Sequence, residues 1–273
     1  MILAALAGLV QGIVEWLPVS SKTMITLIFA AGGFSFGTAY VMGLLANFGS
    51  FFAALWFFRR DIAAAIAGLR HPFADAEDAR TLRYLFLATL ATGVIGVPIY
   101  AVVKTAFTAA TGAVAMVAIG VLLLLTSALN LWRERLARQR DQQPAQLPGT
   151  GVSLLIGACQ GLAALPGISR SAVTVTPLLL LGSSVAQALR LSFLLDVIGL
   201  LGAGIVPLVV GHTGLQAVAN VGGGPVVLML AVSAVASFVT ISAFLRLASR
   251  LRSSVLTLAI GLITIGAALL VPR

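Results

Sequence analysis

Two polar segments in an otherwise apolar sequence contain the residues best suited to chemistry. In the first, Gln11 and Glu15 are four residues apart and therefore share one face of a helix. Pro18 ends that helix, and Ser21 follows shortly after it. A carboxylate near a hydroxyl can serve as a general base for that hydroxyl or for a water, and it can also bind a divalent cation. The first segment therefore predicts acid–base or metal chemistry.

The second segment reads PGISRS and supplies the opposite charge. Pro166 and Gly167 break the chain, and Arg170 falls in the first turn of the helix that follows. A guanidinium group can bind two oxygens of one phosphate, and the start of a helix attracts anions. Further hydrogen bonds to such an anion are expected from the hydroxyl groups of Ser20, Ser169, Ser171 and Thr174. Together the two segments predict a phosphate site.

These segments are copies of one another. Residues 8–21 read GLVQGIVEWLPVSS and residues 157–171 read GACQGLAALPGISRS, so that Gln11 aligns with Gln160. Each copy is an apolar helix that is broken by proline and followed by small hydroxyl residues. Duplicated broken helices that bring opposite charges into a membrane are typical of proteins that bind a polar group there.

Composition assigns the chain to the membrane proteins. It is 60% hydrophobic and 9% charged, with a mean hydropathy of +1.09. Its long apolar runs predict six transmembrane helices, near 38–58, 83–103, 112–132, 185–211, 223–245 and 253–271. The segments 2–34 and 151–182 contain shorter broken helices and predict two re-entrant hairpins, enclosed by protein or facing a cavity. We expect an all-α integral membrane protein without a soluble domain.

Arginines orient these predicted helices. They gather in the loops 59–82, 133–150 and 246–252, which the positive-inside rule places in the cytoplasm. The two halves of the chain then have opposite topology, which predicts an inverted repeat. The expected single membrane domain consists of repeat one (1–132), a polar joint (133–150) and repeat two (151–273).

The net charge of +9 follows from these short basic loops, so we expect no nucleic-acid partner. The single cysteine, Cys159, excludes an intramolecular disulfide and a cysteine-cluster metal site. A structural alternative stays open for the polar segments, because Glu15 and Arg170 could simply neutralise each other. However, a charged residue at the bilayer centre costs about 2.5–3.5 kcal/mol, which favours a function. Asp196, deep in a predicted span, also needs a partner or a function.

At these residues the chain resembles the BacA family of undecaprenyl-pyrophosphate phosphatases. QGIVEWLPVSS is similar to that family's (E/Q)xxxE motif and the LPVSS run after it, and PGISRSAVT resembles its PGxSRSxxT motif. Weaker likeness extends through FGSFFAALWFFRRDI, TLRYLFLATLATGVIGV and LRLSFLLDVIGLLGAG, so that the resemblance covers most of the chain in order.

The resemblance implies a multi-pass enzyme of the cell's inner (plasma) membrane. Such enzymes convert undecaprenyl (C55 polyprenyl) pyrophosphate to the monophosphate, which recycles the lipid carrier of cell-wall synthesis. Carried over to this chain, Gln11 and Glu15 are the metal and acid–base pair, Ser21 is the candidate nucleophile, and Arg170 is the phosphate clamp. A divalent cation, Mg²⁺ or Ca²⁺, is the implied cofactor, and the polyprenyl lipid is the partner. A monomer and a homodimer both stay open, as do serine and water as the attacking group.

The chain departs from the family's pattern directly after the LPVSS run. Where the family continues Thr-Gly-His, this chain reads Lys22-Thr23-Met24, and its two histidines, His71 and His212, fall in predicted loops. Lys22 adds a cation, and Asp196 adds an acid where the family is usually apolar. We expect these two residues to form a compensating pair.

A transporter or flippase of polyprenyl phosphate lipids on the same scaffold is the competing prediction. Inverted repeats with helix tips at mid-membrane are typical of secondary transporters, and loss of the histidine favours this alternative. Retention of Glu15, Ser21 and Arg170 together favours hydrolysis, because transport needs only the anion site. A channel or a purely structural protein explains neither motif.

Overall fold

The computed structural model describes residues 1–140, 147–247 and 253–270, and every regular element in these ranges is helical. Within them, five segments are long and apolar enough to cross a membrane: Phe36–Phe57, Glu77–Ala109, Gly112–Arg138, Val185–Val209 and Gly223–Ala243. The prediction of an all-α integral membrane protein is confirmed. The sixth predicted span, 253–271, corresponds to a shorter helix of 16 residues, Ser253–Ala268. Residue 271, the last of the predicted span, lies outside the described ranges.

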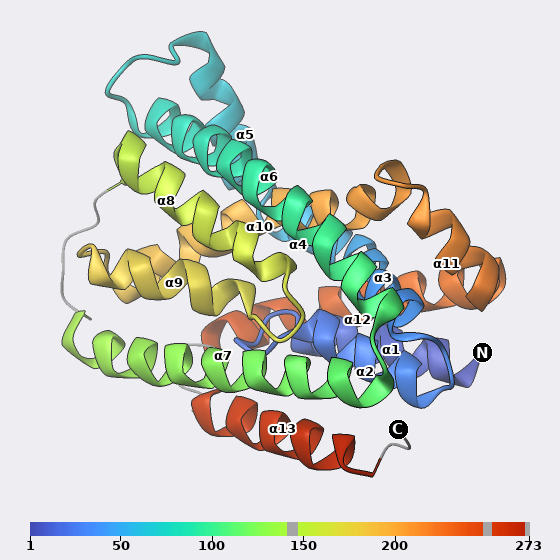
Figure 1. Cartoon of the computed structure of the whole chain (residues 1–273). Coiled ribbons are helices and arrows are strands. Elements are labelled where there is room, and N and C mark those ends of the chain that lie inside the picture. Colours follow the sequence, from blue (N-terminus) through green and yellow to red (C-terminus); the bar gives the residue numbers. More distant parts are fainter. Residues whose placement is uncertain (141–146, 248–252, 271–273) are drawn as a thin grey trace.

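The helices follow in the order that Figure 1 shows. The first half contains α1 (Ile2–Val14), α2 (Ser21–Ala31), α3 (Phe36–Leu45), α4 (Asn47–Phe57), α5 (Arg59–Ala67), α6 (Glu77–Ala109) and α7 (Gly112–Arg140). The second half contains α8 (Thr150–Gly161), α9 (Arg170–Leu180), α10 (Val185–Val209), α11 (Thr213–Val221), α12 (Gly223–Leu247) and α13 (Ser253–Ala268). Single 3₁₀ turns occur at Gly68–Arg70 and Leu162–Ala164.

Some predicted loops contain helices. The short helices α5 and α11 lie within the expected loops 59–82 and 212–222. In α11, Gly214 and Ala217 lie three residues apart and are both buried. One face of this short helix therefore packs on the protein. The predicted joint 133–150 begins as a continuation of α7, and its residues 141–146 lie outside the described ranges, as do residues 248–252 of the third basic loop.

The two hairpins pack against helices of the opposite halves. The first hairpin consists of α1 and α2, and the second of α8 and α9. Helix α1 packs along α12, and α8 packs along α6, while α7 and α13 lie side by side (Figure 1). This exchange of partners brings the ends of both hairpins to the middle of the molecule. The division into repeats at 1–132 and 151–273 stays a prediction.

Glycines allow the hairpin helices to approach the long helices this closely. A Cβ atom at Gly12 would lie 2.5 Å from the Cβ atom of Ala236 on α12. A Cβ atom at Gly157 would lie 2.1 Å from the carbonyl oxygen of Ala88 on α6. Close contact of backbones through small residues is the usual way in which helices associate in a membrane. The glycines of the duplicated segment therefore fix the position of each hairpin.

Replacing Gly157 with valine should destabilise the protein. The new side chain would overlap the backbone of α6, and overpacking of this kind typically costs about 1–3 kcal/mol. The matched control is Gly151→Val on the same helix, because a Cβ atom at Gly151 would meet nothing within 4 Å. Thermal unfolding in detergent measures both variants. Equal transition temperatures for the two would contradict the tight contact between α8 and α6.

Candidate active site

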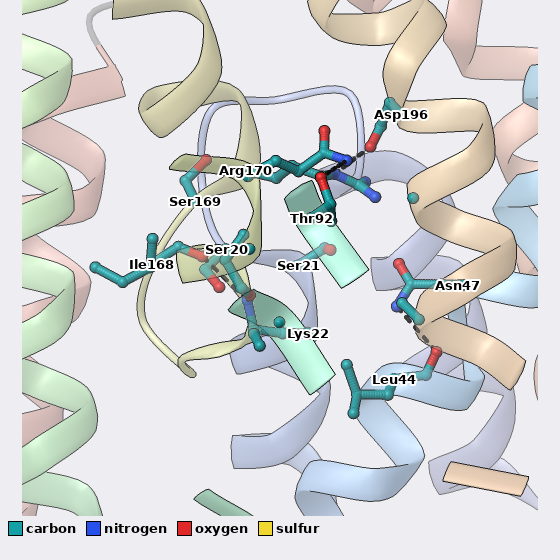
Figure 2. A pocket seen from close by; sticks show the side chains of 18 of the residues that line it. Ser20, Ser21, Lys22, Leu44, Asn47, Thr92, Ile168, Ser169, Arg170 and Asp196 are labelled. Carbon is teal, nitrogen blue, oxygen red and sulfur yellow. Dashed lines mark hydrogen bonds and ion pairs between the residues drawn. The ribbon is translucent and has the colours of Figure 1, made fainter. Parts of the chain in front are cut away.

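The ends of both hairpins meet at one cavity. Helix α2 begins at Ser21 and α9 begins at Arg170, so each hairpin presents the first residue of a helix to this cavity (Figure 2). Helices α6 and α10 supply further parts of its wall. The cavity has a volume of about 230 Å³, which is several times the roughly 30 Å³ that one water molecule occupies in the liquid. It can therefore admit a polar group larger than water.

Ser21 and Gln11 share one oxygen of Glu15. Ser21 donates a hydrogen bond from Oγ to Glu15 Oε2 at 2.5 Å, and Gln11 donates from Nε2 to the same oxygen at 2.6 Å. A hydroxyl group bonded to a carboxylate is the arrangement in which a base can remove the proton of a nucleophile. Glu15 thus contacts both of the other residues that the first segment singled out.

Arg170 lies between two buried carboxylates. Its Nη2 atom pairs with Glu15 Oε1, and its Nε atom pairs with Asp196 Oδ1. Figure 2 shows the arginine extending from the start of α9 to Asp196 on α10. The two carboxylate side chains are only 3% and 5% exposed. Buried carboxylates need a cation beside them, and Arg170 is the cation that these two acids share.

Lys22 is not the partner of Asp196. Its Nζ atom donates hydrogen bonds to the carbonyl oxygens of Ala163 and Ile168, the second at 3.1 Å. The predicted Lys22–Asp196 pair is therefore wrong. Arg170 begins a helix that packs directly on α10, so its side chain reaches Asp196, whereas Lys22 faces the backbone of the second hairpin.

The serines that precede the two helices occupy the expected cap positions without capping them. Ser20 and Ser169 are the N-cap residues of α2 and α9, but neither side chain accepts a hydrogen bond from the helix. Ser20 Oγ lies 2.7 Å from Thr23 Oγ1, and Ser169 Oγ lies 3.3 Å from Ser171 Oγ. Serines that follow a helix-breaking proline are usually expected to cap the next helix, and the structure shows no such side-chain bond at these two positions. Because Ser20, Ser169 and Ser171 border the cavity, their hydroxyl groups are placed to meet a ligand.

Thr174 lies behind the cavity wall. It is fully buried, and its Oγ1 atom donates to the carbonyl oxygen of Arg170 at 3.0 Å. The same atom lies 2.6 Å from Ser192 Oγ, which does border the cavity. Thr174, which the sequence predicted to contact the ligand, therefore lies behind the residues that border the cavity. Its hydroxyl group connects the first turn of α9 to α10.

Helix α7 forms hydrogen bonds with both hairpins. Asn130 donates from Nδ2 to the carbonyl oxygen of Pro18 at 2.7 Å. Thr126 donates from Oγ1 to the carbonyl oxygen of Gly167 at 2.6 Å and accepts from the amide of Ser169 at 3.2 Å. Residues that act together need supporting contacts of this kind to hold their positions. The two hairpin ends are thus fixed to one common helix.

Comparison with known proteins shows the family to which the chain belongs. The family model described as "Bacitracin resistance protein BacA" matches residues 4–268. The chain belongs to the BacA family. Among its curated relatives is an undecaprenyl-diphosphatase of Saccharolobus islandicus, 34% identical over 91% of this chain and 88% of its own length. Undecaprenyl-diphosphatases of Haloarcula marismortui and Pyrobaculum aerophilum are 34% and 35% identical, over 90% and 98% of this chain and 89% and 97% of their own lengths.

No histidine replaces the one that this BacA family member lacks at position 24. Met24 occupies that position and is partly buried. His71 lies in a surface loop, with Nε2 3.0 Å from the carboxylate of Asp78. His212 precedes α11 with a φ of 53°. Both histidines are within the described residues, and neither borders the cavity.

Other polar residues that border the cavity were not identified from the sequence, and they include Asn47, Thr92, Gln160 and Ser192. Asn47 anchors its own side chain by donating to the carbonyl oxygen of Leu44 at 2.9 Å (Figure 2). The usable signal was that Asn47, Thr92 and Ser192 each lie inside a predicted apolar span, where a polar side chain needs a reason. For Gln160, the signal was its alignment with Gln11.

The donor atoms for a divalent cation form an incomplete set. Across the described residues, no group of three or more His, Cys, Asp and Glu side chains is placed to hold a metal ion. Glu15 supplies one carboxylate, and the neighbouring Gln11 has a buried Oε1 atom without a hydrogen-bond partner. Mg²⁺ is commonly bound by one or two carboxylates together with the phosphates of a substrate. Glu15 borders the cavity, and Gln11, which is bonded to it, does not, so a cation there would be bound jointly with a phosphate ligand.

Proposed function

We propose that this BacA family member hydrolyses undecaprenyl (C55 polyprenyl) pyrophosphate to the monophosphate and inorganic phosphate. The family and the names of its curated relatives support this function. The observation that supports it best is the contact of Ser21 with Glu15 beside Arg170, at the cavity where both hairpins end. Nothing in the family, the relatives or the cavity favours a transporter or a flippase.

Arg170 is the proposed clamp for the terminal phosphate. It borders the cavity, and its planar guanidinium group can donate two parallel hydrogen bonds to one phosphate. The starts of α2 and α9 add partial positive charge on the same side. Ser20, Ser169 and Ser171 provide further donors to the phosphate oxygens.

Charge balance supports a divalent cation as cofactor. The charged side chains that border the cavity are two acids, Glu15 and Asp196, and two bases, Lys22 and Arg170, so their formal charges cancel. A bound pyrophosphate group would therefore give the cavity a net negative charge. When bound, Mg²⁺ or Ca²⁺, held by Glu15 and Gln11, would neutralise the negative charge of the phosphate oxygens.

Glu15 is the proposed base. As the terminal phosphorus is attacked, Glu15 Oε2 accepts the proton of the attacking hydroxyl, which belongs to Ser21 or to a water beside it. The new P–O bond forms while the bond from phosphorus to the bridging oxygen breaks, and the polyprenyl monophosphate leaves. When Ser21 attacks, Glu15 first passes the serine proton to the departing monophosphate. Glu15 then accepts a proton from the water that attacks the phosphoserine, and this proton moves to Ser21 Oγ as the bond from phosphorus to Oγ breaks and inorganic phosphate is released.

The apolar spans place the protein in a membrane, and we propose the cell's inner (plasma) membrane as its location. The cavity wall continues from the charged residues to apolar ones on α6 and α10, including Val97, Ile198 and Val206. These surfaces suit a lipid whose pyrophosphate end reaches the arginine while its chain stays in apolar surroundings.

Product analysis tests the proposed function and its need for a metal. Purified protein in detergent is incubated with C55 polyprenyl pyrophosphate, and the lipids and the released phosphate are quantified. We expect one phosphate for each monophosphate lipid formed, loss of activity with a chelator, and recovery with Mg²⁺ or Ca²⁺. Unchanged pyrophosphate lipid in the presence of either metal would contradict the function. Full activity in the chelator would contradict the cofactor.

A further inference from the structure

Lys22 is a charged residue of the cavity wall that the reaction above does not use. It is the second residue of α2, next to Ser21, and it is 7% exposed. It borders the cavity together with Glu15 and Arg170. Figure 2 shows it beside Ser20 and facing the Ile168 end of the second hairpin. A buried lysine in a membrane protein calls for a partner or a function.

The contacts of Lys22 join the first hairpin to the second. Its Nζ atom donates to the carbonyl oxygens of Ala163 and Ile168, on either side of the turn that leads to Arg170. Two other residues of the first half hold the same turn. Thr23 Oγ1 accepts from the amide of Gly167 at 2.6 Å, and Tyr40 donates from its hydroxyl group to the carbonyl oxygen of Ala164 at 2.7 Å.

These contacts leave Lys22 without a direct ion pair among the described residues. An ammonium group has three N–H donors, and the two carbonyl oxygens engage two of them. Within the described ranges, no carboxylate pairs with Lys22, since Glu15 and Asp196 both pair with Arg170. A buried charge that only carbonyl groups solvate is costly. An anion in the cavity, next to Ser21, could pair with Lys22 directly.

We propose that Lys22 is a second cationic contact for the pyrophosphate. Its ammonium group holds the turn before Arg170 through two carbonyl oxygens and directs its third N–H to a phosphate oxygen. This inference rests on the proposed function, because it assumes that the ligand of the cavity is a pyrophosphate. The alternative is a purely structural role, in which Lys22 only connects the two hairpins and adds no charge to the phosphate site.

Ligand binding without turnover tests this inference. The probe is a methylene-bridged diphosphonate analogue of a prenyl pyrophosphate, with the corresponding monophosphonate as the less charged ligand. Lys22→Met should weaken binding of the diphosphonate by about tenfold to a hundredfold, which is typical of losing a hydrogen bond to a charged group. The monophosphonate should lose less affinity. Lys22→Arg should restore diphosphonate affinity to within about threefold of the wild type.

Two further variants separate charge from folding. Lys22→Gln keeps a hydrogen-bond donor and removes the charge, so it should bind the diphosphonate as weakly as Lys22→Met while unfolding at nearly the wild-type temperature. Lys104→Met removes the chain's other lysine, which lies near the end of α6 and does not border the cavity, and it should bind like the wild type.

Three results would overturn the inference: wild-type affinity in Lys22→Gln, equal losses for the two phosphonates, or no rescue by arginine. The proposed function is judged separately, by phosphate release from the wild type. A wild-type protein that binds the diphosphonate through Lys22 but releases no phosphate would refute the phosphatase and leave the contact standing. A protein that releases phosphate at wild-type KM after Lys22→Gln would refute the contact alone.

Discussion

Replacing Glu15 with glutamine should lower phosphate release from polyprenyl pyrophosphate by about 10²–10⁴-fold, the usual contribution of a general base. The amide keeps the size of the side chain and an acceptor for Ser21, but it cannot take a proton. Binding of the lipid should stay largely intact, because the Arg170 clamp remains and a negative charge leaves the site. The expected result is therefore a fall in kcat. Steady-state phosphate release and lipid binding measure the two quantities.

Glu134→Gln is the matched control for this variant. Glu134 also accepts a hydrogen bond from a serine hydroxyl, that of Ser254 at 2.8 Å, but it lies on α7 away from the cavity. Its replacement should leave kcat unchanged. Wild-type turnover in Glu15→Gln would remove Glu15 from the mechanism, and an equal loss in both variants would point to a general effect on the fold.

Replacing Arg170 with alanine should weaken both binding and turnover. The variant loses the proposed phosphate clamp, and donors of this kind are typically worth about 10²–10³-fold in rate. It also leaves Glu15 and Asp196 buried without their shared cation. Removing one partner of a buried ion pair commonly costs about 3–5 kcal/mol, so the variant should also unfold at a lower temperature. Binding assays, kcat/KM and thermal unfolding measure these effects.

Arg190→Ala is the control for this second variant. Arg190 also contacts two carboxylates, Asp61 at 2.7 Å and Glu77 at 3.4 Å, but its side chain is 53% exposed and lies outside the cavity. Exposed ion pairs contribute only about 0–1 kcal/mol. Its loss should therefore leave binding and kcat/KM near the wild-type values. Unaltered lipid affinity in Arg170→Ala would exclude the clamp.

The membrane fold and the residues at its centre were accessible from the sequence for physical reasons. A bilayer requires long apolar helices, so composition and run length alone indicated the class of fold. The duplicated segment marked both hairpins: Pro18 follows the end of α1, and Pro166 precedes the start of α9 at Arg170. Because charges in apolar sequence are costly, Glu15 and Arg170 stood out, and the structure brings them into contact.

What the sequence could not predict depends on how helices pack. Asp196 pairs with Arg170 because α9 lies on α10, and no spacing in the sequence reports that contact. The expected pairing with Lys22 matched charges without knowing that two carbonyl oxygens of the second hairpin face the lysine. Likewise Thr174 shares the α9 helix with Arg170, yet its hydroxyl group contacts Ser192 and does not itself border the cavity. The roles of these residues in catalysis stay predictions.

The most direct test of the central claim is a single turnover measured on wild-type protein and Glu15→Gln with equal amounts of bound C55 polyprenyl pyrophosphate. Protein in excess over lipid is mixed with Mg²⁺ or Ca²⁺ and quenched, and the released phosphate is counted against bound lipid. We predict one phosphate per bound lipid from the wild type and almost none from Glu15→Gln in the same interval. Equal release from both, or none from the wild type, would contradict a phosphatase centre built on Glu15, Ser21 and Arg170.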